Sequence, residues 1–300
     1  MCKTGFRNNQ SHLQEEVISV KNSPLTIFVC THIPFKIPSY IESRPDIYTI
    51  ITNSRERFLP TRLRVLRVDN MQCDYGPDEN MCLNEWRMIN AISHMKTLPE
   101  YIGICHYRRY FDPNVISRLD MDVLTDSGYE MVIGAPVVYN NLLREEHDTF
   151  TYYGYWHNYK DFLLYEKVIR EQYPEMLDAF LEMKEQNYLY NSALMILKRD
   201  DFLNLCDYAF KAYESMKNEF GIHNDKDALQ YVLDREDEYV KPYNPYYNAE
   251  MQSRILSYGM ERYGTNTWIR KKREDGTKIL DKAAEIQWIM PDNKDIIIGN

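Results

Sequence analysis

Glycine is scarce in this chain, and the motifs that depend on it are missing. There are 11 glycines in 300 residues, with no Walker loop and no G-x-G-x-x-G fingerprint, which argues against a P-loop NTPase and an ordinary dinucleotide oxidoreductase. The hydrolase motifs H-E-x-x-H and G-x-S-x-G are also absent. The six cysteines show no C-x-x-C spacing, which indicates reduced thiols in a cytosolic protein.

Long apolar runs and an excess of positive charge are missing as well. No apolar stretch approaches the roughly 18 residues of a membrane span, and residues 1–21 lack the apolar core of a signal peptide. We therefore expect a cytoplasmic protein. The 45 acidic residues outnumber the 36 basic ones, for a formal charge of −9, which disfavours a general affinity for nucleic acid.

The chain does have enough apolar residues for a large core, since 44% are hydrophobic. Short apolar runs predict strands at 25–32, 47–51, 63–68, 101–106, 131–136 and 189–197. Helical periodicity predicts helices at 80–96, 161–170, 174–185, 200–216, 228–235 and 249–262. Because a helix leads directly into the strand at 101–106, we expect an α/β fold with a mostly parallel sheet.

The segment 101–111 is the most informative stretch. Its apolar run ends in His106, Tyr107, Arg108 and Arg109. A guanidinium group holds two phosphate oxygens at once and keeps its proton, and ligands of open α/β sheets bind beyond the carboxyl ends of the strands. This pattern favours an anion site, with pairing of the arginines to some of the many carboxylates as the alternative.

Acidic residues elsewhere supply further candidates. Glu85 lies beside the apolar stripe of the helix at 80–96, either as a solvated flank or as a partner for the arginines. Asp225 and Asp227 come just before a predicted helix. Helix capping explains Asp225 most simply, and a metal or general-base role is the alternative.

Two more segments allow two interpretations each. The aromatic run at 149–157 suits a loop that lines a cleft or one that packs on the surface. The basic run at 270–273 is most simply a solvated turn, and contact with an acidic membrane surface is the alternative.

Residues 101–111 resemble the hallmark Y-V/I-G-L-C-H-Y-R-R-Y-F of a bacterial domain family from capsular, exopolysaccharide and lipopolysaccharide gene clusters. That family is catalogued as a domain of unknown function and grouped with glycosyltransferases. Other segments agree in the same order. They are the strand ending in Thr31 and His32, Glu85, and residues 168–175, 190–196 and 252–262. The chain departs from the family where Trp156-His157 replaces a histidine pair and Tyr263 replaces a leucine.

The resemblance implies one GT-A-like, Rossmann-type domain at residues 25–269. An N-terminal lead segment (1–24) would precede it, and a basic turn with a C-terminal tail (270–300) would follow. It further implies a glycosyltransferase, of hexosyltransferase type and inverting, that moves a sugar from a nucleotide-sugar donor, UDP-linked, onto a growing surface polysaccharide (capsule, exopolysaccharide or O-antigen). The other expected partner is a glycan or lipid-linked glycan acceptor, with peripheral inner-membrane contact as an option.

The strand that ends at His106 lacks the acidic pair that many nucleotide-sugar transferases use to hold a divalent metal. We therefore expect side-chain cations to take its place, and no metal or other cofactor. The expected catalytic residues are His106, Arg108, Arg109, Asp225 and Asp227. The expected substrate-binding residues are Thr31, His32, Glu85, Tyr107, His157, Asn191, Glu261 and Arg262. The alternative functions are a non-catalytic nucleotide- or glycan-binding module and a sugar-phosphate phosphoryl-transfer or hydrolytic enzyme.

Overall fold

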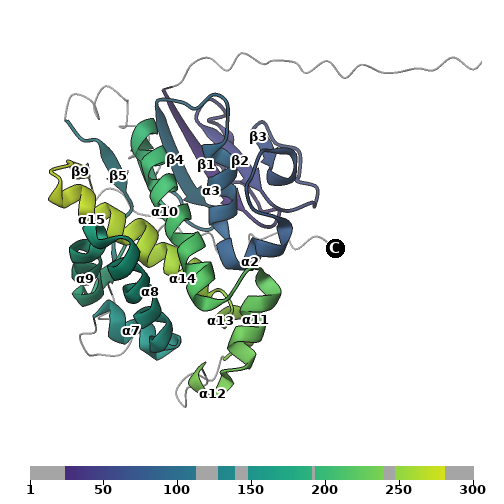
Figure 1. Ribbon diagram of the computed structural model, residues 1–300. Helices are drawn as coiled ribbons and strands as arrows, with labels where there is room; N and C mark the ends of the chain where they lie inside the picture. The colour runs from purple at the N-terminus through teal and green to yellow at the C-terminus, as the bar shows by residue number, and fades with distance from the viewer. Residues whose placement is uncertain (1–23, 113–127, 139–147, 191–192, 240–246, 281–300) are drawn as a thin grey trace, which may run out of the picture.

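The computed structural model describes residues 24–112, 128–138, 148–190, 193–239 and 247–280. Within them, seven strands form one sheet in the order β3-β2-β1-β4-β8-β5-β9 (Figure 1). The strands are β1 Leu25–Thr31, β2 Tyr48–Thr52, β3 Arg64–Arg67, β4 Tyr101–His106, β5 Met131–Ile133, β8 Met195–Lys198 and β9 Ile279–Leu280. Strands β1 to β4 run parallel, and β8 runs antiparallel to both of its neighbours. The expected α/β fold with a mostly parallel sheet is confirmed.

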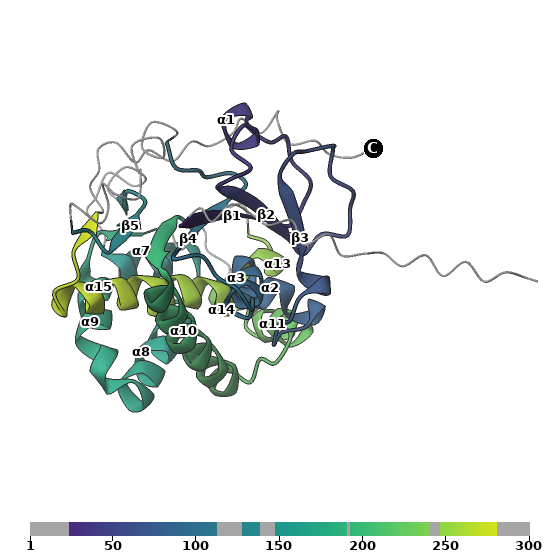
Figure 2. The same cartoon turned by 90° about the horizontal axis from the view of Figure 1, so that it is seen from above.

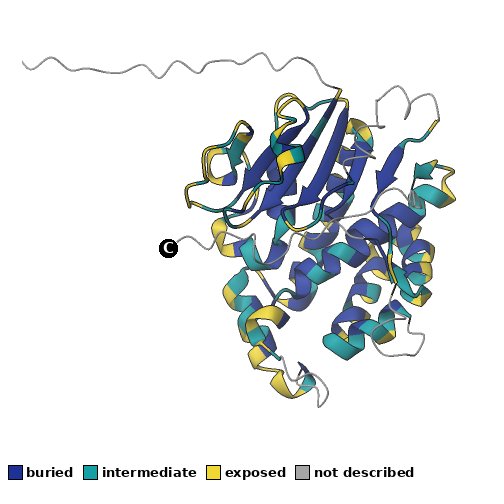
Figure 3. Ribbon diagram, turned by 180° about the vertical axis from the view of Figure 1, so that it is seen from behind, coloured by how far each residue is buried: buried dark blue, intermediate teal, exposed yellow. Residues whose placement is uncertain are grey.

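Strand β1 shows how an apolar sequence builds both faces of this sheet. Successive side chains of a strand point to opposite faces. Phe28 and Cys30 join one core cluster, whereas Ile27 and Val29 join the other. Because both faces are covered, the central strands are almost wholly apolar, as buried parallel strands are, and Figure 3 shows them as buried.

Most helices cover one face of the sheet (Figure 2). The longer ones are α3 Glu85–Ser93, α7 Thr149–Trp156, α8 Tyr159–Gln172, α9 Leu177–Glu185, α10 Arg199–Phe220, α11 Asp225–Leu233 and α15 Thr267–Glu274. The shorter segments are α1 Ser39–Glu42, η1 Val68–Asn70, η2 Pro77–Glu79, α2 Asn80–Leu83, η3 Pro174–Met176, α12 Glu236–Tyr239, α13 Ala249–Gln252, α14 Ile255–Gly259 and the π-helical η4 Met260–Asn266. A separate ribbon pairs β6 Val137–Val138 with β7 Tyr188–Leu189.

The helix expected at 80–96 is broken in two. Asn84 has φ 52° and ψ −122°, a positive-φ conformation outside the left-handed helical region that residues other than glycine rarely adopt. It ends α2 and begins α3 in a new direction. Because of this interruption, Glu85, the first residue of α3, lies at the carboxyl edge of the sheet. The helix expected from periodicity would have continued straight through this position.

Four other expectations are wrong. The strand expected at 189–197 is divided between β7 and β8, and the helix expected at 249–262 is divided into α13, α14 and η4. The aromatic run at 149–157 is largely the helix α7, capped by Asp148, whose carboxylate accepts the N–H of Thr151. The basic run at 270–273 is not a solvated turn, because it lies within α15 and Arg270 is 2% exposed. Lys271 pairs with Asp275 at 2.6 Å, and Lys272 pairs with Asp201 at 2.5 Å. The short helical stretch expected up to residue 124 lies outside the described residues.

Gly103 sets the spacing between β1 and β4. A Cβ atom at this position would lie 2.7 Å from Cγ1 of Ile27 and 3.2 Å from its Cα. Real carbon atoms do not approach so closely, so a side chain here would push the two central strands apart. The absence of a Cβ at Gly103 lets β4 deliver its end to the position described next.

Candidate active site

The turn after β4 carries the paired arginines to the carboxyl edge of the sheet. The N–H of His106 donates to the carbonyl of Arg109 at 3.1 Å, and the N–H of Arg109 donates back at 2.8 Å. Arg108 is exposed and Arg109 is half-buried. The structure therefore confirms that the strand ends at His106 with both guanidinium groups just beyond it.

Both arginines line a pocket of about 160 Å³. Its walls come from the α2–α3 junction, the β4 turn, the approach to β8, α14 and η4. The lining residues are Asn84, Glu85, His106, Arg108, Arg109, Ala193, Ser257, Tyr258 and Glu261. Ligand pockets usually measure roughly 300–1,000 Å³. The described residues thus enclose room for part of a ligand, such as a diphosphate, and five of them were predicted from the sequence to form the site.

His106 is a neutral hydrogen-bond donor in this pocket. The N–H of Arg108 donates to its Nδ1 at 3.3 Å, so the hydrogen-bond network assigns the ring proton to Nε2. Burial, followed by the charges of Arg108 and Arg109, lowers the pKa of His106 to about 2. The imidazole can donate a hydrogen bond to a ligand oxygen, but the positive charge comes from the arginines.

His32 and Tyr107 lie beside His106, outside the pocket lining. The ring centroid of His32 is 6.4 Å from that of His106 and 5.1 Å from that of Tyr107. Desolvation, then Arg108 and Arg254, lower the pKa of His32. Arg254 is therefore a third guanidinium group close to the strand end. Arg254 belongs to the segment 252–262 that resembles the family, but the sequence did not predict it as a site residue.

His157 belongs to a buried layer behind the pocket. Its Nδ1 lies 2.8 Å from Oε1 of Gln252, and its ring centroid lies 4.3 Å from that of Tyr258, which lines the pocket. Burial and then the charge of Arg262 lower the pKa of His157 to about 3. Arg262 is 5% exposed, donates to the carbonyl of Tyr258 at 2.7 Å and stacks 4.7 Å from the ring centroid of Tyr153. These two residues support Tyr258 rather than line the pocket.

The two candidate aspartates also lie outside the lining. The carboxylate of Asp225 accepts the N–H groups of Met81 and Cys82 at 2.9–3.0 Å and so fixes α2 in place. The carboxylate of Asp227 accepts the N–H of His223 at 3.1 Å. Both aspartates lie in the first turn of α11, and the N-cap of this helix is Asn224. The expectation that Asp225 caps the helix is therefore wrong.

Of the remaining predicted residues, Thr31 is fully buried and its hydroxyl donates to the carbonyl of Ile33 at 2.5 Å. Asn191 lies outside the described residues. Pocket residues that sequence reasoning missed are Asn84, Ala193, Ser257 and Tyr258. Hydrophobic periodicity marks none of these four residues.

Two searches of the described residues bear on partners of the site. No group of three or more His, Cys, Asp or Glu side chains in the described ranges is arranged to hold a metal ion. Within the same part of the chain, none of the helices combines the length and the apolar character needed to cross a bilayer.

Comparison with known proteins places this geometry in context. The family model of a domain of unknown function, DUF4422, matches residues 26–240. Among curated proteins, no match is found. A solved structure, the bifunctional glycosyltransferase WbbM in its apo form, superposes with a TM-score of 0.63 at 15% sequence identity. The superposition covers 90% of this chain and 45% of that one, so the chain spans less than half the length of its structural neighbour. At this identity the likeness shows the fold alone.

Proposed function

This chain belongs to the DUF4422 family, and we propose that it is a glycosyltransferase that uses a nucleotide-sugar donor, UDP-linked, to extend a bacterial surface polysaccharide. The observation that carries the proposal is the convergence of Arg108, Arg109 and neutral His106 with two carboxylates in one pocket at the carboxyl edge of the sheet. The fold shared with a glycosyltransferase supports it. Nucleotide ligands of open α/β sheets bind at this edge.

The arginines would bind the diphosphate of the donor. As the bond to the sugar breaks, negative charge grows on the leaving diphosphate, and fixed cations aimed at that position lower the barrier. A guanidinium group fits this task because its parallel N–H groups hold two phosphate oxygens. The Nε2–H of His106 would add a neutral hydrogen bond to the same oxygens. In this proposal, side-chain cations do the work that a divalent ion does in many sugar transferases.

The carboxylates would handle the sugar and the acceptor. Glu85 and Glu261 line the pocket with the arginines, and carboxylates accept hydrogen bonds from sugar hydroxyls. An inverting transfer also needs a base for the acceptor proton. The carboxylates of Asp225 and Asp227 accept backbone N–H groups outside the pocket lining, and His157 stacks behind Tyr258. The base is then one of the two carboxylates that line the pocket, and we propose Glu261, whose side chain is 30% exposed and lies 3.6 Å from Nη1 of Arg262.

The test removes one guanidinium group. Arg109→Ala should reduce donor turnover at least a hundredfold, because a single charge-stabilising contact in a site contributes about 10²–10³ in rate. Release of free nucleotide from a panel of UDP-sugars, with and without a glycan acceptor, measures it. The matched control is Arg170→Ala on α8, an exposed arginine that pairs with Glu166 and should leave turnover unchanged.

Three outcomes would count against the proposal. Turnover that survives Arg109→Ala would remove the role of the arginines. A donor that binds the wild-type chain without ever being turned over would favour a binding module. Turnover that is abolished by EDTA and restored by Mn²⁺ would show that a metal, rather than the arginines alone, carries the charge.

A further inference from the structure

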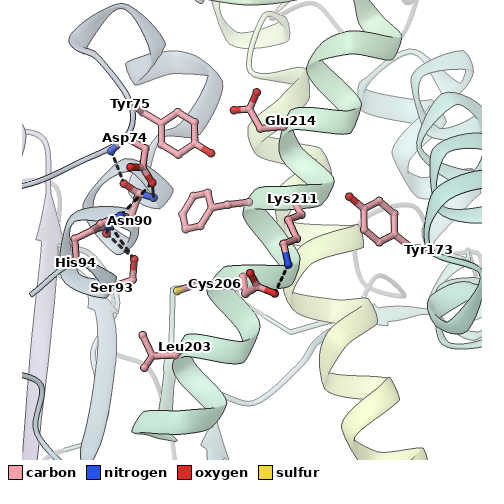
Figure 4. Close-up of a pocket in the computed structure, with 12 residues that line it drawn as sticks. Asp74, Tyr75, Asn90, Ser93, His94, Tyr173, Leu203, Cys206, Lys211 and Glu214 are labelled. Atoms are coloured by element: carbon pink, nitrogen blue, oxygen red, sulfur yellow. Dashed lines mark hydrogen bonds and ion pairs between the residues drawn. The ribbon is translucent and has the colours of Figure 1, made fainter.

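A second and larger pocket lies between α3 and α10, away from the candidate active site. Its volume is about 600 Å³, inside the range of pockets that hold small ligands. Figure 4 shows Asp74, Tyr75, Asn90 and His94 on one side and α10, with Leu203 and Glu214, on the other. None of these residues takes part in the chemistry proposed above.

Aromatic rings supply the apolar part of this pocket. Phe210 packs against Tyr75 with ring centroids 5.5 Å apart and against Trp86 at 5.7 Å in an edge-on arrangement. These contacts hold the Phe210 ring, which is half-buried, in one orientation. Leu203 adds a 37% exposed aliphatic side chain at the same surface. Apolar side chains at the surface, here the half-buried Phe210 and the exposed Leu203, suit the apolar face of a sugar ring.

Carboxylates supply the polar part. Asp207 pairs with Lys211 at 2.8 Å, Asp74 accepts the side-chain amide of Asn90 at 3.1 Å, and Glu214 lies 3.5 Å from Lys217. Asp74 also lies 3.3 Å from Nε2 of His94, and Glu214 also accepts a hydrogen bond from the hydroxyl of Tyr75. Each carboxylate can accept about four hydrogen bonds, so one or two partners leave capacity for ligand hydroxyls. Three carboxylates around one pocket disfavour a phosphate or another anion. The local cations also reduce the attraction for a positively charged ligand.

Helix α3 connects this pocket to the candidate active site. Its first residue, Glu85, lines the smaller pocket, and Asn90 and Ser93 near its end line the larger one. At about 1.5 Å of rise per residue, Asn90 and Ser93 lie roughly 8 and 12 Å from Glu85 along the helix axis. A chain of a few sugar units can span such a distance.

We propose that the pocket between α3 and α10 binds a neutral pyranose unit of the acceptor glycan, at a distance from the site of transfer. The proposal rests on the proposed glycosyltransferase function, because it takes the ligand to be the acceptor. It commits to a neutral sugar with no charged substituent at the bound unit.

The test measures sugar binding without any donor. Maltotriose and cellotriose serve as neutral probes, tri-galacturonic acid as the anionic probe and tri-glucosamine as the cationic one. Saturation-transfer NMR and calorimetric titration follow binding to the full chain. Leu203→Trp should fill the pocket and weaken binding of the neutral probes at least tenfold. Leu163→Trp, on an exposed position of α8 (43% exposed), is the matched control and should leave binding unchanged.

Glu214→Gln provides a second variant that does not alter the shape of the pocket. It should weaken neutral-sugar binding several-fold while the melting temperature stays within a degree or two of the wild type. The proposal is overturned if neither neutral probe binds, if Leu203→Trp binds them as the wild type does, or if only a charged probe binds. Because no donor is present, failure here leaves the nucleotide-release result of the proposed function untouched, and the reverse also holds.

Discussion

Asp161 is the buried group whose titration should be easiest to detect. It is fully buried and accepts hydrogen bonds from the hydroxyls of Tyr239 (2.6 Å) and Tyr231 (3.3 Å). Burial raises its pKa to about 7 from a model-peptide value of 3.8, and the two tyrosine hydrogen bonds oppose that rise only in part. The folded protein thus holds a proton that the unfolded chain gives up near pH 4.

The sign of the effect on stability follows from that difference. A carboxyl group whose pKa is raised by folding contributes fully to the free energy of unfolding below pH 4. This contribution is lost as the pH rises through 7. From pH 5 to pH 8 the loss is about 3 kcal/mol, since each pKa unit corresponds to about 1.4 kcal/mol. His106 and His157, whose pKa values are lowered, act in the opposite direction by losing stability as the pH falls below 6.5.

The perturbation is Asp161→Asn, which keeps the shape of the side chain and removes its titration. Urea unfolding of wild type and variant at pH 5, 6, 7 and 8, followed by circular dichroism, gives the free energy of unfolding at each pH. The histidine contributions are common to both proteins and cancel in the difference. We expect the stability of the variant relative to wild type to increase by about 3 kcal/mol from pH 5 to pH 8.

A matched control tests whether the pH dependence belongs to Asp161. Asp178 lies exposed in the first turn of α9, so Asp178→Asn should shift stability by no more than about 0.5 kcal/mol at any pH. The reasoning fails if the difference between Asp161→Asn and wild type is constant across the range. That result would mean that the carboxyl group is ionised in the folded protein at pH 5.

Two further predictions concern the active site and the sheet. Glu261→Gln should retain donor binding, seen as thermal stabilisation by the nucleotide sugar. It should reduce acceptor-dependent nucleotide release by about 10²-fold or more. A release rate equal to that of Glu85→Gln or of wild type would remove Glu261 as the base. Gly103→Ala should lower the free energy of unfolding by about 1–3 kcal/mol because the new Cβ overlaps Ile27. Gly154→Ala, where the nearest atom is Tyr159 Cβ at 3.4 Å, is its control, and equal urea midpoints for the two variants would contradict the argument.

Strands β1 to β5 followed from local patterns, whereas the strand expected at 189–197 is divided between β7 and β8, and β9 was not predicted. The apolar run at 101–106 predicts a buried strand, and the observed β4 has those bounds. The placement of Arg108 and Arg109 beyond it follows as well, since residues adjacent to a strand end must lie at that edge. Such predictions succeed because side-chain alternation and burial act over a few neighbouring residues.

The candidate site itself was only partly predictable. Glu85 and Glu261 reach the pocket because Asn84 breaks a helix and because η4 winds as a π-helix, and neither feature appears in hydrophobic periodicity. The resemblance to a family named these residues, but it did not show that they meet. In the same way, Asp225 looked like the cap of its own helix and instead holds the N–H groups of Met81 and Cys82.

The sequence by itself determined most of the segments that form the sheet and which of them ends in two guanidinium groups. Only the tertiary structure decided which carboxylates stand opposite those groups, that His106 is neutral, and that a second pocket opens between α3 and α10. The physical reason is the distance along the chain over which each kind of interaction acts. Periodicity reports how neighbouring side chains divide between faces, whereas a pocket, a buried pKa or a long-range cap depends on segments far apart in the chain that only packing brings together.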